Sequence, residues 1–106
     1  MSDLAAEAHN AVEHGNLPRL RAALDAGSPA DAMDASGMCL LCHAVDVEVD
    51  SHTQSGERPL HVDATALLLA RGADPYATCA YGTSAQSALL RGHWLASELF
   101  MLRRDE

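Results

Sequence analysis

With 106 residues, the chain has the size of one domain with a modest core, and its 48% hydrophobic and 21% charged residues are typical of a folded globular protein. Its 15 acidic residues outnumber 7 lysines and arginines, and because a net charge of −8 repels phosphate backbones, we expect no nucleic-acid partner. No apolar run is long enough to cross a bilayer, and three cysteines cannot close a disulfide framework, so we expect reduced thiols and no membrane association.

The first residues carry acid where an export signal would carry base, so we expect a cytoplasmic protein. Ser2 or Asp3 is placed to cap a helix whose apolar residues recur at helical spacing and that ends at Gly15. Asn16 caps a second helix, and Gly27 is placed as its left-handed C-cap. This stretch therefore predicts a hairpin of two helices.

Residues 28–37, SPADAMDASG, are rich in turn-forming residues and predict a connection, after which a new helix starts at Met38. A similar pattern returns at residues 67–82, where Gly72 and Gly82 are ten residues apart, as are Gly27 and Gly37. His9 in the first helix and Cys42 in the third are separated by 33 residues, which is the length of the ankyrin unit.

The sequence RGADP at residues 71–75, the turn from Asp34 to Gly37 and the pair Gly92-His93 add to this spacing, and over nearly the whole chain these features resemble the ankyrin-repeat family. The resemblance implies an all-α fold, a short ankyrin-repeat solenoid of stacked helix-turn-helix units in a single domain, residues 1–106. It also places His9 at the histidine of the family's T-P-L-H-x-A motif, which commonly links neighbouring repeats through side-chain hydrogen bonds.

We assign repeat one to residues 3–36, repeat two to residues 37–81 and repeat three to residues 82–106. The second repeat is about 12 residues longer than the 33-residue unit, so we expect an inserted, exposed loop within residues 46–58, with an extended first helix leading into it as an option. Pro59 would then open the outer helix.

A competing alignment places residues 56–61, GERPLH, on the repeat motif itself. It leaves sixteen residues between Gly56 and Gly72, where the family needs about 23, so we prefer the insertion. Where the motif's T-P-L-H would stand, the second repeat has CLLC at residues 39–42 and the third has SAQS at residues 84–87. The three repeats are therefore all degenerate.

The two ends of the array should be polar caps, because an end repeat has no neighbour on one side. Charged residues mark both ends: Glu7, Glu13, Arg19, Arg21, Arg103, Arg104, Asp105 and Glu106. We therefore expect a complete, monomeric protein. Trp94 and Phe100 should lie in the core of the last repeat, the alternative being an exposed patch for self-association.

Residues 39–43, CLLCH, match the attachment motif of c-type haem. Haem attachment is usual in exported proteins and the chain has no export signal, so we interpret these residues as the inner helix of repeat two. A zinc site would have suitable ligand types in Cys39, Cys42 or His43 with His52 or His61. One C-x-x-C pair without a second is a weak signal, and we expect buried thiols with no metal and no cofactor.

Acidic residues of the insertion have the spacing of a calcium-binding loop: Asp46, Glu48, Asp50 and Glu57. Ser51 stands where that loop needs glycine, so we expect no calcium site. The sequence contains no phosphate-binding loop, nucleophile elbow or metalloprotease motif, and His9 and His14 do not share a helix face. We therefore expect no enzymatic activity.

The resemblance implies that a partner protein is bound by the hairpin tips and the exposed side of the inner helices. The corresponding residues are Met33, Ala35, Ser36 and Met38 at the first tip, Thr78, Ala80, Tyr81 and Thr83 at the second, and His14, Asp46 and Val47 on the inner helices. Tyr81 and Met38 are the strongest single candidates, because Tyr and Met are enriched at interfaces. For Met33 and Tyr76, packing beneath their own hairpin is an equal alternative.

The sequence thus predicts a non-catalytic protein–protein interaction module whose partner is another protein. The alternative is an acidic inhibitor, such as an immunity protein that neutralises a basic toxin or nuclease. The net charge of −8 and the acidic insertion favour this alternative, because they would attract a basic partner.

Overall fold

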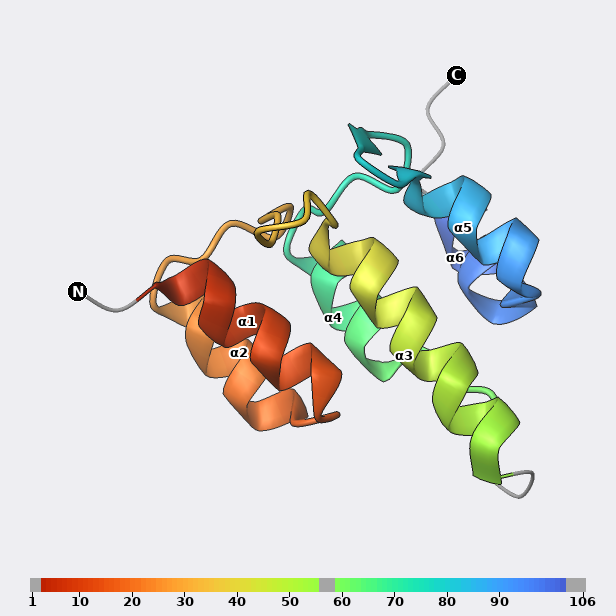
Figure 1. Cartoon of the computed structure of the whole chain (residues 1–106), viewed down its shortest axis with the longest axis horizontal. Coiled ribbons are helices and arrows are strands. Elements are labelled where there is room, and N and C mark those ends of the chain that lie inside the picture. The colour runs from red at the N-terminus through yellow and green to blue at the C-terminus, as the bar shows by residue number, and fades with distance from the viewer. Residues whose placement is uncertain (1–2, 56–58, 103–106) are drawn as a thin grey trace.

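The computed structural model describes residues 3–55 and 59–102, and this part of the chain is mainly helical (Figure 1). Its six helices are α1 (Leu4–Glu13), α2 (Leu17–Asp25), α3 (Leu40–Ser55), α4 (Asp63–Ala70), α5 (Ser84–Arg91) and α6 (Trp94–Leu102). A two-stranded antiparallel hairpin, β1 (Thr78–Cys79) and β2 (Gly82–Thr83), makes the fold mainly helical and not strictly all-α. None of the described helices is both long and apolar enough to cross a membrane.

Consecutive helices pair into three hairpins that lie side by side, with α3 and α4 in the middle (Figure 1). Helix α1 packs on α3 and α3 packs on α5, while α2 packs on α4. The inner helices α1, α3 and α5 therefore form one layer, with their hairpin partners behind them (Figure 1). Both connections between hairpins lie along the same edge of the molecule (Figure 1).

The first hairpin begins and ends where its capping residues predict. The side chains of Asp3 and Asn16 accept backbone hydrogen bonds from the first turns of α1 and α2, at 3.2 and 3.1 Å. Gly15 and Gly27 follow these helices with φ values of +64° and +118°, which L side chains rarely adopt. Local capping signals are thus sufficient to define this part of the fold.

Most of the inserted segment is helix, so the expected exposed loop is wrong over residues 46–55, and the alternative of an extended first helix is confirmed there. Helix α3 continues to Ser55, and α4 begins at Asp63 and not at Pro59, while residues 56–58 lie outside the described residues. Residues 46–54 contain no glycine or proline, and Glu48 and Val49 turn a buried side of the helix toward the other hairpins. Their polar composition reflects the exposed side of a long helix.

The core runs through all three hairpins and is built mainly from aliphatic side chains. Its largest buried hydrophobic residues are Leu20, Leu40, Leu41, Val45, Leu68 and Phe100. Leu24 in α2 and Leu68 in α4 precede Gly27 and Gly72 by three and four residues, and both are buried. The outer helices of two hairpins therefore each contribute a leucine to the core from the last turn before a glycine, one residue apart in register.

The last hairpin exposes apolar side chains where a polar cap was expected. These residues on α5 and α6 are Leu89, Leu90, Trp94, Met101 and Leu102. Phe100 is buried as predicted, but Trp94 is 62% exposed, because six residues along a helix turn the side chain by about 120° from Phe100. The charged residues 103–106, on which the cap was predicted, lie outside the described residues.

Candidate protein-binding surface

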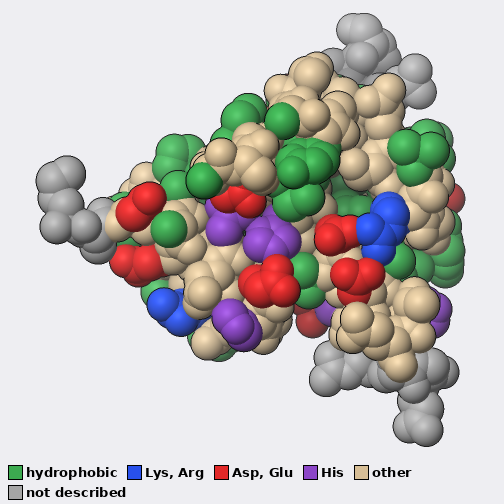
Figure 2. Space-filling model, viewed as in Figure 1, with side chains coloured by type: hydrophobic (Ala, Val, Ile, Leu, Met, Phe, Trp, Pro, Cys, Tyr) green, Lys and Arg blue, Asp and Glu red, His purple; other side chains and the backbone are tan. Residues whose placement is uncertain are grey.

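The inner helices and the hairpin tips together form the face of the molecule shown in Figure 2. Acidic side chains surround histidines near the centre of this face, and a basic side chain lies among acidic ones toward α5 (Figure 2). We call this surface the inner-helix face. It carries most of the residues that the sequence predicts to bind a partner.

The two tips, which lie at residues 33–38 and 78–83 in the connections between the helix pairs, contact one another. The backbone N–H of Ala80 donates to the carbonyl of Gly37 at 3.0 Å, and the Tyr81 hydroxyl donates to Ser36 Oγ at 3.3 Å. Gly37 has a φ of +87°, and a Cβ at this position would lie 2.8 Å from the Cβ of Ala80. Glycine is therefore required here both for its conformation and for the close approach of the second tip.

Asp34 fixes the conformation of the first tip. Its Oδ1 accepts hydrogen bonds from the Ser36 hydroxyl at 2.7 Å, the Ser36 N–H at 2.9 Å and the Met38 N–H at 3.0 Å. These bonds, first the one from the Ser36 side chain, lower the pKa of Asp34 to about 2. The carboxylate stays charged and keeps Ser36 and Met38 in place beside Tyr81.

A groove with a volume of about 190 Å³ lies between α3, α5 and the tips, and we call it the tip groove. It is lined by Met38, Cys42, Val45, Asp46, Tyr81, Ser87 and Arg91. Arg91 reaches from α5 to α3, where its guanidinium bonds Asp46 and also Asp50, the latter at 2.7 Å. The groove therefore combines apolar walls with a charged cluster in which two carboxylates share one cation.

The structure brings three of the predicted binding residues together in this groove: Met38, Asp46 and Tyr81. Six others are exposed along the tips and inner helices: Met33, Ala35, Ser36, Thr78, Ala80 and His14. Thr83 has a structural role, since its hydroxyl caps α5 in a reciprocal pair of hydrogen bonds with Gln86. Val47 lies outside the tip groove and lines a different cavity, described below.

The structure decides whether Met33 and Tyr76 pack beneath their own hairpin, which the sequence left open. Met33 is 51% exposed and does not pack beneath its hairpin. Tyr76 is partly exposed, and its hydroxyl donates to the carbonyl of Phe100 at 2.9 Å, which anchors the second connection on α6. Arg91 joins the groove although the sequence did not single it out, because its position depends on the packing of α5 against α3.

A chain of hydrogen bonds joins the first two hairpins at the centre of the face. His9 Nε2 donates to the carbonyl of Ala32 at 3.0 Å, the Nδ1 atoms of His9 and His43 are 2.8 Å apart, and His43 Nε2 lies 2.8 Å from a Glu13 carboxylate oxygen. The carbonyl can only accept, so the Nε2 of His9 carries a proton and donates to Ala32. His43 takes part in the chain of hydrogen bonds through both of its ring nitrogens.

Burial lowers the pKa of His9 below its usual 6.5, which disfavours the charged form of that ring. His43 lies next to the Glu13 carboxylate, at 2.8 Å. The face therefore contains a buried histidine that links two hairpins and a partly buried histidine directed toward an exposed acid.

Acidification should destabilise the chain through His9. Because its folded pKa is below 6.5, the unfolded chain binds a proton that the folded chain does not. The His9 contribution is complete above about pH 6.5 and is lost as the pH falls through the folded pKa. In thermal denaturation between about pH 8 and about pH 5, the unchanged chain should lose more Tm on acidification than His9→Gln. Equal pH dependence in the two chains would contradict this assignment.

Glu48 is buried, contrary to its expected place in an exposed acidic loop. It is 2% exposed and accepts hydrogen bonds from the Thr65 hydroxyl at 2.7 Å and the Thr65 N–H at 3.1 Å. His93 Nε2 lies 2.7 Å from the same carboxylate. His93 Nδ1 accepts from the Ala96 N–H, so Nε2 carries the proton and donates to Glu48. The sequence signal for the burial of Glu48 was its position three residues after Val45, on the same side of a helix.

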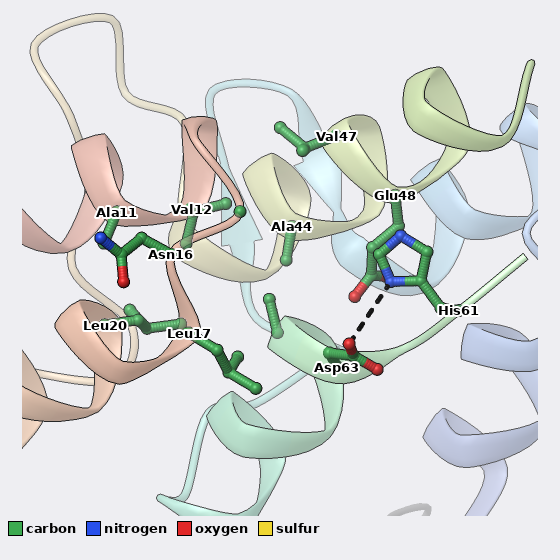
Figure 3. Close-up of a pocket in the computed structure, with 12 residues that line it drawn as sticks. Ala11, Val12, Asn16, Leu17, Leu20, Ala44, Val47, Glu48, His61 and Asp63 are labelled. Atoms are coloured by element: carbon green, nitrogen blue, oxygen red, sulfur yellow. Dashed lines mark ion pairs between the residues drawn. The ribbon is translucent and has the colours of Figure 1, made fainter. Parts of the chain in front are cut away.

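A small cavity of about 60 Å³ lies between the first two hairpins (Figure 3). Apolar residues of α1 to α4 line most of it, and His61 and Asp63 lie at one side, with His61 Nδ1 4.0 Å from Asp63 Oδ2 (Figure 3). The volume corresponds to a few water molecules at most. We interpret this cavity as a packing gap between hairpins, and Val47 at its rim as part of that packing.

The cysteines form a group that the sequence did not foresee. Within residues 3–55 and 59–102, Cys39, Cys42 and Cys79 are buried with their sulfurs within 4.8 Å of one another. His43, expected beside the first two, is directed instead toward His9 and Glu13. Cys79 was missed because it lies 37 residues from Cys42 and reaches it through the packing of the second tip against the first.

Comparisons with known proteins give no family assignment. No family model matches the chain, and no curated protein matches it. Function therefore has to be inferred from the spacing of the hairpins and from the geometry of the inner-helix face.

Proposed function

We propose that the chain is a non-catalytic protein-binding module made of three degenerate ankyrin-like repeats stacked as a short solenoid. The repeats are residues 3–36, 37–81 and 82–106, with the second extended by a longer inner helix. In support, His9 and Cys42 are 33 residues apart and lie at corresponding places on the inner helices of neighbouring hairpins. His9 also links its hairpin to the next connection through Ala32, the role that the family resemblance implies.

The observation that carries the binding proposal is the convergence of both tips and α3 at the tip groove. Met38 and Tyr81 supply an adaptable and a rigid apolar contact, and Asp46 and Asp50 outnumber the one cation between them. Such a groove suits a protein segment that presents an apolar side chain next to lysine or arginine. The proposal implies a monomer that binds another protein and needs no cofactor.

Replacing Tyr81 with alanine should weaken binding of the partner by about 1–3 kcal/mol, as expected for an aromatic hot spot. The partner is first identified by mass spectrometry of proteins captured from a native lysate, and binding kinetics are then measured with purified chains. Met38→Ala should act in the same direction. Arg21→Ala, an exposed change on α2 in the opposite layer, is the control. Normal binding by both groove variants would place function on another face.

The second candidate is an acidic inhibitor of a basic toxin or nuclease, which the net charge of −8 favours. An inhibitor of this kind should associate more slowly as salt is added, because charges are screened over about 8 Å at physiological ionic strength. The charges to neutralise are Asp46 and Asp50, since Glu48 is buried and its replacement would destabilise the fold. An association rate that is independent of salt would favour the adaptor over the inhibitor.

A further inference from the structure

Three sulfur atoms meet between the second and third hairpins. Cys39 immediately precedes α3, Cys42 lies in its first turn, and Cys79 belongs to β1. The sulfurs of Cys42 and Cys79 are 3.7 Å apart, and all three lie within 4.8 Å of one another. Sulfurs that share one metal ion at a bond length of about 2.3 Å lie about 4 Å apart, so the cluster is close to the spacing that a metal requires.

The start of α3 favours a thiolate at Cys39. The backbone N–H of Cys42 donates to the Cys39 sulfur at 3.4 Å, as it would to a capping side chain, and the helix dipole favours negative charge there. A donor at the start of the helix is therefore in place to stabilise the Cys39 sulfur when it binds a cation as a thiolate.

Hydroxyl groups surround the sulfurs as outer partners. Ser84 is fully buried, and its Oγ lies 3.3 Å from the Cys39 sulfur and 3.4 Å from the Cys42 sulfur. Ser87 Oγ lies 3.7 Å from the Cys42 sulfur. These hydroxyls can donate to negatively charged sulfur and so hold the ligands in place.

Cys42 and Cys79 occupy positions that hold other residue types at the interface between the first two hairpins. Cys42 lies 33 residues after His9, and Cys79 lies 45 residues after Asp34, the same offset that separates Gly37 from Gly82. Between the first two hairpins these positions hold a histidine and a carboxylate engaged in hydrogen bonds. Between the second and third hairpins both are sulfur, which exchanges a hydrogen-bonding interface for a set of soft ligands.

We propose that Cys39, Cys42 and Cys79 form a buried site that binds one Cu(I) ion through three sulfur ligands. Thiolates select soft ions such as Cu(I) and Zn(II), and structural zinc almost always takes four ligands. The described residues bring three sulfurs to this point, and the neighbouring His43 is engaged elsewhere, so a three-coordinate ion fits best. The histidines considered from the sequence as zinc ligands are not part of this site.

Binding is a ligand exchange without a redox step. All three cysteines bind as thiolates, and the metal displaces their thiol protons, which pass to solvent. The tip groove gives access, since Cys42 forms part of its wall beside Met38 and Tyr81. A bound ion would join β1 to α3 and so fix the second tip against the middle hairpin.

The test uses the full chain, reduced and free of oxygen, with Cu(I) supplied from a coloured Cu(I) chelator that competes for the ion. One Cu(I) per chain should leave the chelator, with thiolate-to-copper charge-transfer absorption and a raised Tm. Cys79→Ser and Cys42→Ser should each lose more affinity than the about 10–100-fold expected for the outer partner variant Ser84→Ala. His43→Gln is the control and should keep full affinity.

X-ray absorption of the unchanged chain loaded with Cu(I) counts the sulfur ligands without relying on any variant. Three sulfurs at one distance would support the site. Retention of all copper by the chelator, a copper bound by nitrogen or oxygen, or undiminished affinity in Cys79→Ser would overturn it. A parallel titration with Zn(II) decides the ion, because tight zinc binding with no uptake of Cu(I) would overturn the three-coordinate assignment.

Discussion

Replacing Glu48 with alanine should lower the free energy of unfolding by about 3–5 kcal/mol, the cost of removing one member of a buried, hydrogen-bonded pair. The substitution leaves three donors without an acceptor: the hydroxyl and N–H of Thr65 and the Nε2–H of His93. Thr65 and His93 are both fully buried, so water cannot replace the carboxylate without opening the core. Glu48→Gln should be intermediate, because its amide keeps one acceptor and turns a donor toward other donors.

Urea denaturation of each variant measures this loss. Glu98→Ala removes an exposed glutamate from α6 and should leave the free energy of unfolding nearly unchanged, which makes it the matched control. If Glu48→Ala unfolds at nearly the same urea concentration as the unchanged chain, Glu48 is solvated and the insertion is a surface loop after all.

Leu68→Ala and Leu24→Ala should each cost about 2–5 kcal/mol, because both remove a buried side chain from the core and leave a cavity. Leu68 is fully buried in the middle hairpin and Leu24 is 7% exposed in the first, so the larger loss is expected for Leu68. With neighbouring hairpins coupled through their interfaces, either variant should still unfold in a single transition.

The same substitution at Leu90, which is 87% exposed, is the control and should change the free energy of unfolding little. Denaturant unfolding followed by circular dichroism measures all three variants. A loss below about 1 kcal/mol at both Leu24 and Leu68 would mean that neither leucine lies in a packed core between the hairpins and that the repeat boundaries are wrong.

The parts of the fold that the sequence predicts are those defined by local contacts. Asp3 and Asn16 cap their helices through backbone N–H groups three residues away, so the first hairpin can be located from the local sequence. The length of α3 was only partly signalled locally: residues 46–54 lack glycine and proline, but the burial of Glu48 depends on His93, 45 residues away. Trp94 was misplaced for a local reason, because six residues along a helix turn it away from the buried Phe100.

The residues of the candidate site likewise differ in whether the sequence could predict them. Met38 and Tyr81 could be named from the position of the tips, because tips of neighbouring hairpins fall on one edge. Arg91 could not, because its position beside Asp46 depends on the packing of α5 against α3. Cys79 is similar, since its sulfur reaches Cys42 through the packing of the second tip on the first, which is a long-range contact.

The pair formed by Glu48 and His93 also determines how the molecule opens. Side-by-side hairpins that touch mainly their neighbours can detach one at a time from an end, and local opening then costs less than global unfolding. Here the end hairpin cannot leave the middle one without separating a buried carboxylate from its imidazole donor. Helices α3, α4, α5 and α6 therefore belong to one cooperative unit, whose amides should become accessible to hydrogen exchange together.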